Sequence, residues 1–235
     1  MVYEIAGLRI DVKSKYKYDE YAWSEFIAPS QDGKCDFSVS VTDADIENEE
    51  RHGEPDGYVE SICLCREISK RLPNYGRSLL HGAAVAIGDT VYMFVGRSGA
   101  GKSTHARLWL KYVPDSYILN GDKPIVERND DAFIIHGTPW KGKEGYGINR
   151  SAKLGGFLFI NQAKENGARK LSKNEFAERL LSQIYLPKTG VEALAMLEIA
   201  DQLVSHLPAY LLDCDISRNA VEHSYKALTG EDLAE

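Results

Sequence analysis

The residues best suited to chemistry form the glycine-rich segment GRSGAGKST at positions 96–104. It fits the pattern G-x-x-x-x-G-K-S/T, in which backbone amides surround the phosphates of a nucleotide, a lysine reaches the β- and γ-phosphates, and a hydroxyl binds Mg²⁺. Lys102 and Ser103 occupy the last two places. The alternative is a glycine-rich turn that fits by chance. We predict a phosphate-binding loop whose nucleotide-binding residues are Gly96, Ser98, Gly99, Ala100, Gly101, Lys102, Ser103 and Thr104.

A carboxylate follows the next apolar segment of the chain. Residues 117–119 are apolar and lead into Asn120, Gly121 and Asp122. A short helix and an immediate return to the sheet would bring Asp122 to the edge where the loop begins, close to the γ-phosphate. A phosphotransfer site needs a group that positions or deprotonates the acceptor and groups that hold Mg²⁺. We predict that Asp122 is catalytic together with Lys102, and a metal ligand together with Ser103. The alternative is that Asp122 begins a turn with Lys123 and Pro124.

A second loop with possible function is GTPWKGKEGYG, residues 137–147. Its glycines allow movement, its charged side chains suit an anionic ligand, and its rings could cover a site. We predict that it is flexible and acts as a lid or substrate-binding segment through Lys141, Lys143 and Glu144, with Arg150 just beyond. A solvated basic loop would have the same composition, so that interpretation stays open.

Helices and strands that position these residues follow from periodicity. Apolar runs at 83–87 and 90–95, separated by Gly88 and Asp89, predict a hairpin that leads directly into the loop. Helices are predicted at 58–72, 102–112, 172–184, 191–206 and 217–230, and strands at 2–12, 36–41, 117–122, 125–128, 132–136, 154–160 and 209–214, with a turn at 129–131. The fold class is therefore α/β, with a mixed sheet and a helical C-terminal packing unit. We expect a single domain over 1–235, made of a β-rich portion (1–76) and a loop-containing core (77–235).

Composition restricts the class of partner. The chain has 235 residues, a net charge of −7 and 43% hydrophobic residues, as in ordinary globular proteins. An acidic balance argues against a nucleic-acid partner, and no segment approaches the length of a membrane span or a signal peptide. We therefore expect a cytoplasmic protein without a membrane partner. Its four cysteines lack paired metal-site spacing, so we interpret them as free thiols. The oligomeric state is left open.

The hairpin, GRSGAGKST, ILNGDKP and GTPWKGKE together resemble the catalytic domain of HPr kinase/phosphorylase and its smaller bacterial relatives, which share a fold with phosphoenolpyruvate carboxykinases. The resemblance runs from about Leu80 to Ala227 and includes His81 in LLHGAAV and the segment PAYLLDCD. It implies that the loop binds ATP, that Lys102 and Ser103 act on phosphates and Mg²⁺, and that Asp122 activates an acceptor hydroxyl. It also adds His81 to the candidate substrate-binding residues.

Two departures from that family change the expected acceptor. The larger enzymes carry two adjacent aspartates where this chain has Asp122 alone, and the arginine-glycine run and long final helix of true HPr kinases are missing. HPr is therefore not the expected acceptor. The resemblance implies a kinase of another hydroxyl, on a small protein or peptide, free serine or a small metabolite. The alternative is a non-catalytic nucleotide-binding sensor or scaffold, which the single carboxylate favours.

Overall fold

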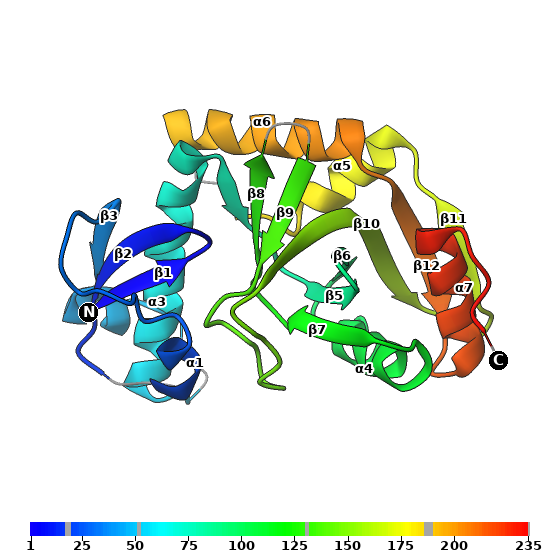
Figure 1. Ribbon diagram of the computed structural model, residues 1–235, viewed down its shortest axis with the longest axis horizontal. Coiled ribbons are helices and arrows are strands. Elements are labelled where there is room, and N and C mark those ends of the chain that lie inside the picture. Colours follow the sequence, from blue (N-terminus) through cyan, green and yellow to red (C-terminus); the bar gives the residue numbers. More distant parts are fainter. Residues whose placement is uncertain (17–19, 51–52, 130–131, 186–189, 235) are drawn as a thin grey trace.

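A computed structural model describes residues 1–235 except 17–19, 51–52, 130–131, 186–189 and 235. Within the described residues the strands form two sheets, one of three strands and one of nine (Figure 1). The mixed α/β architecture predicted from the sequence is confirmed. The turn predicted at 129–131 lies partly outside the described residues.

The N-terminal portion forms the small sheet and the helices beside it. Its elements are β1 (Val2–Ile5), β2 (Leu8–Lys13), α1 (Glu20–Ser24), β3 (Phe37–Ser40), α2 (Asp43–Glu47), α3 (Asp56–Arg71) and the 3-10 helix η1 (Leu72–Tyr75). The single strand predicted over 2–12 is wrong, because Ala6 and Gly7 turn the chain with φ values of 51° and 73°. A short helix, α2, follows β3, and Thr42 and Asp45 cap its start reciprocally.

The large sheet is mixed, and its strand order is β4-β8-β9-β10-β6-β5-β7, with β12 on β10 and β11 on β12. Its strands are β4 (Arg77–Leu79), β5 (Ala83–Ile87), β6 (Thr90–Val95), β7 (Ser116–Asn120), β8 (Ile125–Asn129), β9 (Ala132–His136), β10 (Ser151–Gln162), β11 (Gly167–Lys170) and β12 (Ala209–Cys214). Strands β5 and β6 pair antiparallel from Ala83↔Phe94 to Ile87↔Thr90, so the predicted hairpin is confirmed. Strand β10 runs parallel to both β6 and β12.

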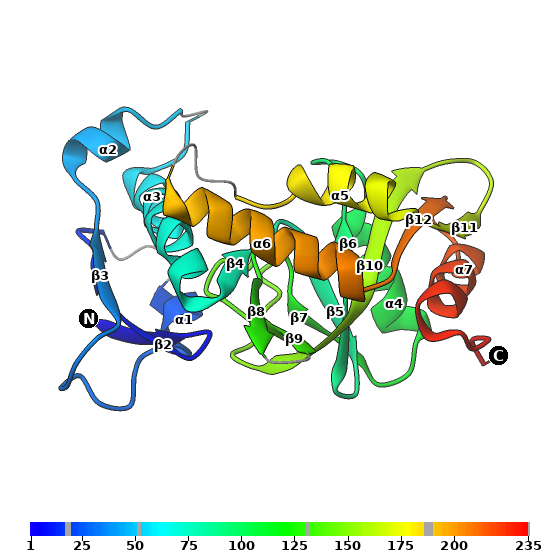
Figure 2. The ribbon, with the colours of Figure 1, turned by 90° about the horizontal axis from the view of Figure 1, so that it is seen from above.

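Helices cover both faces of the large sheet. They are α4 (Lys102–Tyr112), α5 (Lys173–Leu181), α6 (Val191–His206) and α7 (Arg218–Thr229). Side chains alternate between faces along a strand, so Met93 packs with Phe176 and Met196 under α5 and α6, while Phe94 packs with Trp109 under α4 and α7. Figures 1 and 2 show these two pairs of helices on opposite sides of the strands.

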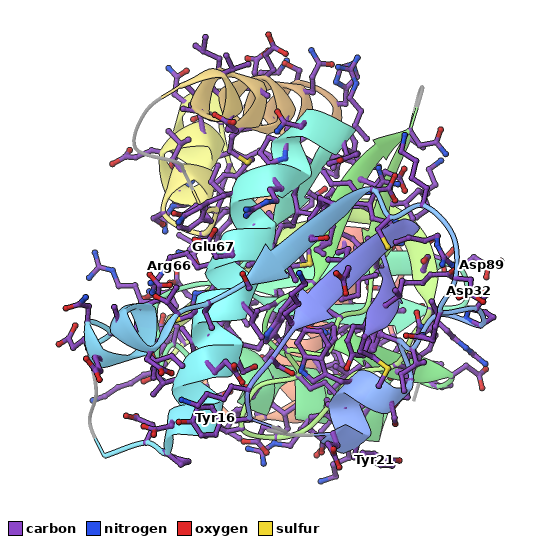
Figure 3. The ribbon with its side chains drawn as sticks, turned by 90° about the vertical axis from the view of Figure 1, so that its left-hand side faces the viewer. Tyr16, Tyr21, Asp32, Arg66, Glu67 and Asp89 are labelled. Atoms are coloured by element: carbon purple, nitrogen blue, oxygen red, sulfur yellow. The ribbon has the colours of Figure 1, made fainter. Side chains whose placement is uncertain are left out.

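A third cluster of buried side chains joins the N-terminal portion to the large sheet. It combines Ile68 of α3 and Trp23 with Ile125 of β8 and Trp140. Figure 3 shows α3 crossing the N-terminal end of the molecule, where Arg66 donates to Glu49 Oε2 at 2.6 Å. The flexible surface loop predicted at 137–147 is therefore partly wrong, because Trp140 is only 7% exposed and belongs to this core.

Candidate functional site

The glycine-rich loop, residues 96–101, links β6 to the start of α4. Gly96 and Gly101 have φ values of 153° and 100°, which side chains other than glycine rarely adopt. A Cβ atom on Gly96 would lie 3.2 Å from the carbonyl oxygen of Ile160. The N-cap residue of α4, Gly101, has no side chain to cap the helix, so the first amides and the positive end of the helix dipole can face an anion.

The Lys102 side chain folds back over this loop. Its Nζ donates to the carbonyl oxygens of Gly96 at 2.9 Å and Arg97 at 3.2 Å. Burial lowers the pKa of Lys102, while neighbouring Asp122 acts in the opposite direction. The lysine therefore lies inside the loop and within the electrostatic range of the predicted carboxylate.

Helix α4 is fixed by a buried contact with α7. Trp109 Nε1 donates to Ser224 Oγ at 2.8 Å, and His105 Nε2 lies 2.9 Å from the same oxygen. Both rings also contact Phe94 of β6, with ring centroids 5.1 Å and 5.4 Å away respectively. The helix that carries Lys102 and Ser103 is thus held by strand and helix together.

Asn120, at the end of β7, places Asp122. Its Oδ1 accepts hydrogen bonds from the backbone amides of Asp122 at 3.0 Å and Lys123 at 2.9 Å. Its Nδ2 donates to the carbonyl oxygen of Thr138 at 3.1 Å. Asn120 is fully buried, and the amide of Gly82 donates to the carbonyl oxygen of Asp122 at 3.0 Å. These bonds fix the turn that presents the carboxylate.

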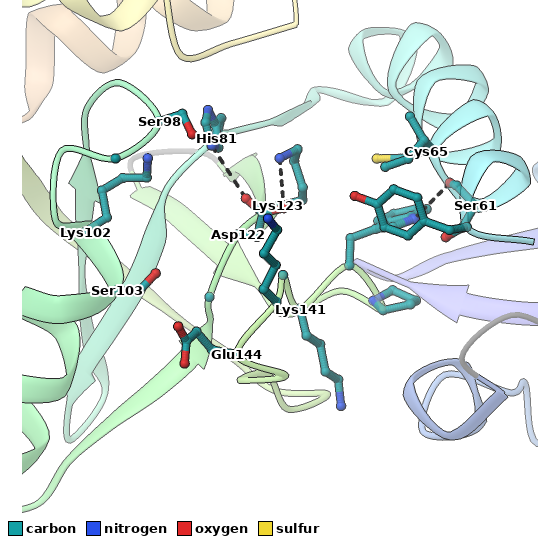
Figure 4. Close-up of a pocket in the computed structure, with 18 of the residues that line it drawn as sticks. Ser61, Cys65, His81, Ser98, Lys102, Ser103, Asp122, Lys123, Lys141 and Glu144 are labelled. Carbon is teal, nitrogen blue, oxygen red and sulfur yellow. Dashed lines mark hydrogen bonds and ion pairs between the residues drawn. The ribbon is translucent and has the colours of Figure 1, made fainter. Parts of the chain in front are cut away.

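The Asp122 carboxylate lies among basic side chains (Figure 4). Oδ2 is 2.9 Å from Lys123 Nζ, and Oδ1 is 3.5 Å from His81 Nε2. Burial and then the charges of Lys123 and Lys102 lower the pKa of His81 to about 4. His81 is therefore neutral near pH 7, and the cations that face Asp122 are lysines.

One pocket of about 890 Å³ contains much of the predicted site. The predicted residues that line it are Ser98, Gly99, Gly101, Lys102, Ser103, Thr104, His81, Asp122, Lys141, Lys143 and Glu144. Gly96 and Ala100 line an adjoining cavity of about 1100 Å³. Arg150 is exposed and lines neither space.

The second predicted loop is less free than expected. Lys141 is only 7% exposed, and its Nζ pairs with Glu25 Oε1 at 2.7 Å, away from Asp122 (Figure 4). Glu144 lies 3.5 Å from Arg107 of α4. Residues 137–141 are buried and residues 142–145 are exposed, so only the second half of the loop lies at the surface.

Sequence reasoning missed several residues that line the pocket. Lys123 directly follows Asp122. We considered it only as part of a turn, although its positive charge also indicated a role in the site. Arg107 lies one helical turn beyond Ser103, a spacing that the helix prediction contained. Residues Tyr58, Ser61, Ile62 and Cys65 of α3 also line the pocket, and their helical spacing alone indicates only an apolar face.

The donor set suits Mg²⁺ bound together with phosphates. Among the described residues no group of three or more His, Cys, Asp or Glu side chains could hold a metal by itself. Mg²⁺ commonly takes one or two carboxylates and completes its shell with water and substrate phosphates. Ser103 and Asp122, in one pocket with an uncapped helix N-terminus, fit that requirement.

Comparisons with known proteins show a distant likeness in structure but none in sequence. No protein-family profile and no curated protein matches this sequence. The fold is similar to a solved structure of the Hpr(Ser) kinase/phosphatase from Coxiella burnetii, with 8% identity and a TM-score of 0.35, over 61% of this chain and 90% of that one. In the part of the chain that the structure describes, no helix is both long and apolar enough to cross a membrane.

Proposed function

We propose that this protein is a cytoplasmic, ATP- and Mg²⁺-dependent phosphotransferase that transfers the γ-phosphoryl group to a hydroxyl. The observation that supports this proposal is the shared pocket of Lys102, Ser103 and Asp122 beside the uncapped start of α4. Such transfer depends on positioning and charge neutralisation more than on covalent chemistry by the protein.

Each residue then has a defined role. The loop amides and Lys102 bind the phosphates, and Ser103 and Asp122 hold the metal. When bound, Mg²⁺ would neutralise charge on the β- and γ-phosphates. Asp122 orients the acceptor hydroxyl and takes its proton while the hydroxyl oxygen bonds to the γ-phosphorus and the bond to the ADP oxygen breaks. The acceptor is a serine of a small protein or peptide, free serine or a small metabolite, and HPr is not expected.

Two substitutions separate binding from chemistry. Lys102→Ala should abolish ATP binding measured by calorimetry, whereas Lys111→Ala, near the other end of α4, should leave it unchanged. Asp122→Asn keeps the shape but removes the charge, so ATP should still bind while transfer falls by about 10²- to 10⁴-fold. Unchanged ATP affinity in Lys102→Ala would contradict the proposal. Full activity in Asp122→Asn would move the base to another residue, with Glu144 next.

A non-catalytic nucleotide-binding sensor or scaffold is the second candidate. The observation that favours it is that Asp122 already contacts Lys123 at 2.9 Å and is the one carboxylate predicted at this position. Incubation with γ-labelled ATP, candidate acceptors and water distinguishes the two. Tight binding without any turnover would favour the sensor or scaffold.

A further inference from the structure

The pocket extends past Asp122 to the N-terminal portion of the chain. In Figure 4, Lys102 and Ser103 lie on one side of Asp122, and Ser61 and Cys65 of α3 lie on the other. Cys65 is buried, and its thiol lies close enough to Asp122 and Lys123 for both charges to act on its pKa, which burial raises to about 12. Helix α3 is thus a near neighbour of the carboxylate.

The α3 side of the pocket differs chemically from the loop side. Its lining combines the apolar and aromatic residues Trp23, Ile62, Cys65 and Trp140 with the polar groups of Tyr58, Ser61 and Glu54. Lys102 and the loop amides lie at the other side, and Lys123 lies beside Asp122, between the two sides (Figure 4). Phosphates gain nothing from an apolar surface, whereas an apolar group that is buried there leaves water favourably.

The aromatic part of this surface is held in place before any ligand binds. Trp140 Nε1 donates to the carbonyl oxygen of Ser61 at 3.2 Å. The Trp23 and Trp140 rings meet edge to face, with centroids 5.4 Å apart, and are 8% and 7% exposed. A pre-formed surface binds without the cost of ordering its side chains.

We propose that the acceptor binds between Asp122 and α3, and that it carries an apolar or aromatic group beside its hydroxyl. This inference rests on the proposed phosphotransferase function. In-line transfer requires the attacking hydroxyl and the leaving ADP to lie on opposite sides of the γ-phosphorus. The nucleotide binds on the glycine-rich loop, and Asp122 lies between that loop and α3. The attacking hydroxyl therefore approaches the γ-phosphorus from the α3 side. Free serine, which has two charged groups and no apolar part, fits this surface poorly.

Binding can be measured without turnover. In the presence of Mg²⁺ and a non-hydrolysable ATP analogue, calorimetry compares four hydroxyl probes: N-acetyl-seryl-phenylalanine amide, N-acetyl-seryl-aspartate amide, 2-phenylethanol and free serine. We expect the apolar probes to bind at least about tenfold more tightly than the polar ones, the effect of burying one apolar side chain. Tight binding of the dipeptide alone indicates a peptide acceptor. Tight binding of 2-phenylethanol as well indicates a small alcohol.

Variants assign the effect to α3. Ile62→Trp should fill the space and weaken the apolar probes by about tenfold or more, with affinity for the ATP analogue unchanged. Leu194→Trp, on an exposed site of α6, is the matched control and should alter neither affinity. Ile62→Asp provides a second variant if the tryptophan disturbs folding, and circular dichroism checks both.

The outcomes separate this inference from the proposed function. Equal affinity for apolar and polar probes, or apolar binding that survives both Ile62 variants, would overturn the acceptor site. Transfer from γ-labelled ATP is assayed in parallel with the same probes. Apolar probes that bind in an Ile62-dependent way but are never phosphorylated would instead refute the phosphotransferase function.

Discussion

His105 connects the helix of the glycine-rich loop to the last helix through a side chain that is only 2% exposed. Ser224 Oγ donates to the carbonyl oxygen of Val221 at 2.9 Å and accepts from Trp109. The single hydroxyl proton of Ser224 is therefore used in the bond to Val221. His105 Nε2, 2.9 Å from Ser224 Oγ, must then donate a hydrogen bond to that oxygen. Nδ1 of His105 is buried and has no hydrogen-bond partner among the described residues. Protonation would place an unpaired charge there.

This arrangement predicts a loss of stability in acid. Burial lowers the pKa of His105 to about 4 from an ordinary value of 6.5. The unfolded chain then binds the proton more readily than the native chain, so stability falls as the pH drops from about 6.5 towards about 4. Linkage with these two values removes about 2 kcal/mol of stability between about pH 7 and about pH 4.5.

Urea unfolding of the wild type and of His105→Phe, at about pH 7 and about pH 4.5, measures this contribution of His105 to stability. Phenylalanine keeps a ring against Phe94 and leaves Ser224 with Trp109 and Val221. We expect the variant to lose about 2 kcal/mol less stability than wild type on acidification. His81 and His136 are present in both proteins, so their contributions cancel when the acid-induced losses of stability are subtracted. His206→Gln, at an exposed site, controls for the removal of a histidine. Equal acid sensitivity in wild type and His105→Phe would refute the reasoning.

Two further predictions concern the placement of Asp122 and the exposed part of the second loop. Asn120→Ala removes the acceptor for two backbone amides, so we expect the rate of phosphoryl transfer to fall sharply while ATP affinity stays nearly unchanged. Asn120→Asp should recover part of that rate. An unchanged turnover rate in Asn120→Ala would show that Asn120 does not position Asp122. Hydrogen exchange with and without Mg²⁺ and an ATP analogue should show new protection at residues 142–145 and none at 138–141, and identical exchange at 142–145 in both states would argue against a lid.

Local sequence patterns were sufficient for the elements that carry the loop. Helices α4 and α6 match their predicted ranges, 102–112 and 191–206, and a capping box of Ser172 and Glu175 opens α5 at the predicted start, residue 172. These elements are specified by periodicity and end signals within a few residues. The predicted break at Gly230 is also found, with a left-handed φ of 81°. The assignments of site residues stay predictions until they are measured.

Long-range contacts account for what the sequence did not reveal. Strand β4 has three residues and exists through pairing with β8, from Arg77↔Glu127 to Leu79↔Ile125. Trp140 looked like part of a solvated loop because its partners, Trp23 and Ser61, come from distant segments. The burial of Trp140 depends on how the N-terminal portion packs against the large sheet, and no local sequence pattern predicts that packing. The α3 side of the pocket was missed for the same reason.

The distribution of charge explains how an acidic chain can attract an anion at this pocket. The net charge is −7, yet Lys102 and Lys123 both line this pocket. Two nearby acids are engaged elsewhere, since Glu25 pairs with Lys141 and Glu144 lies beside Arg107. A binding site responds to the local field more than to the total charge of the protein.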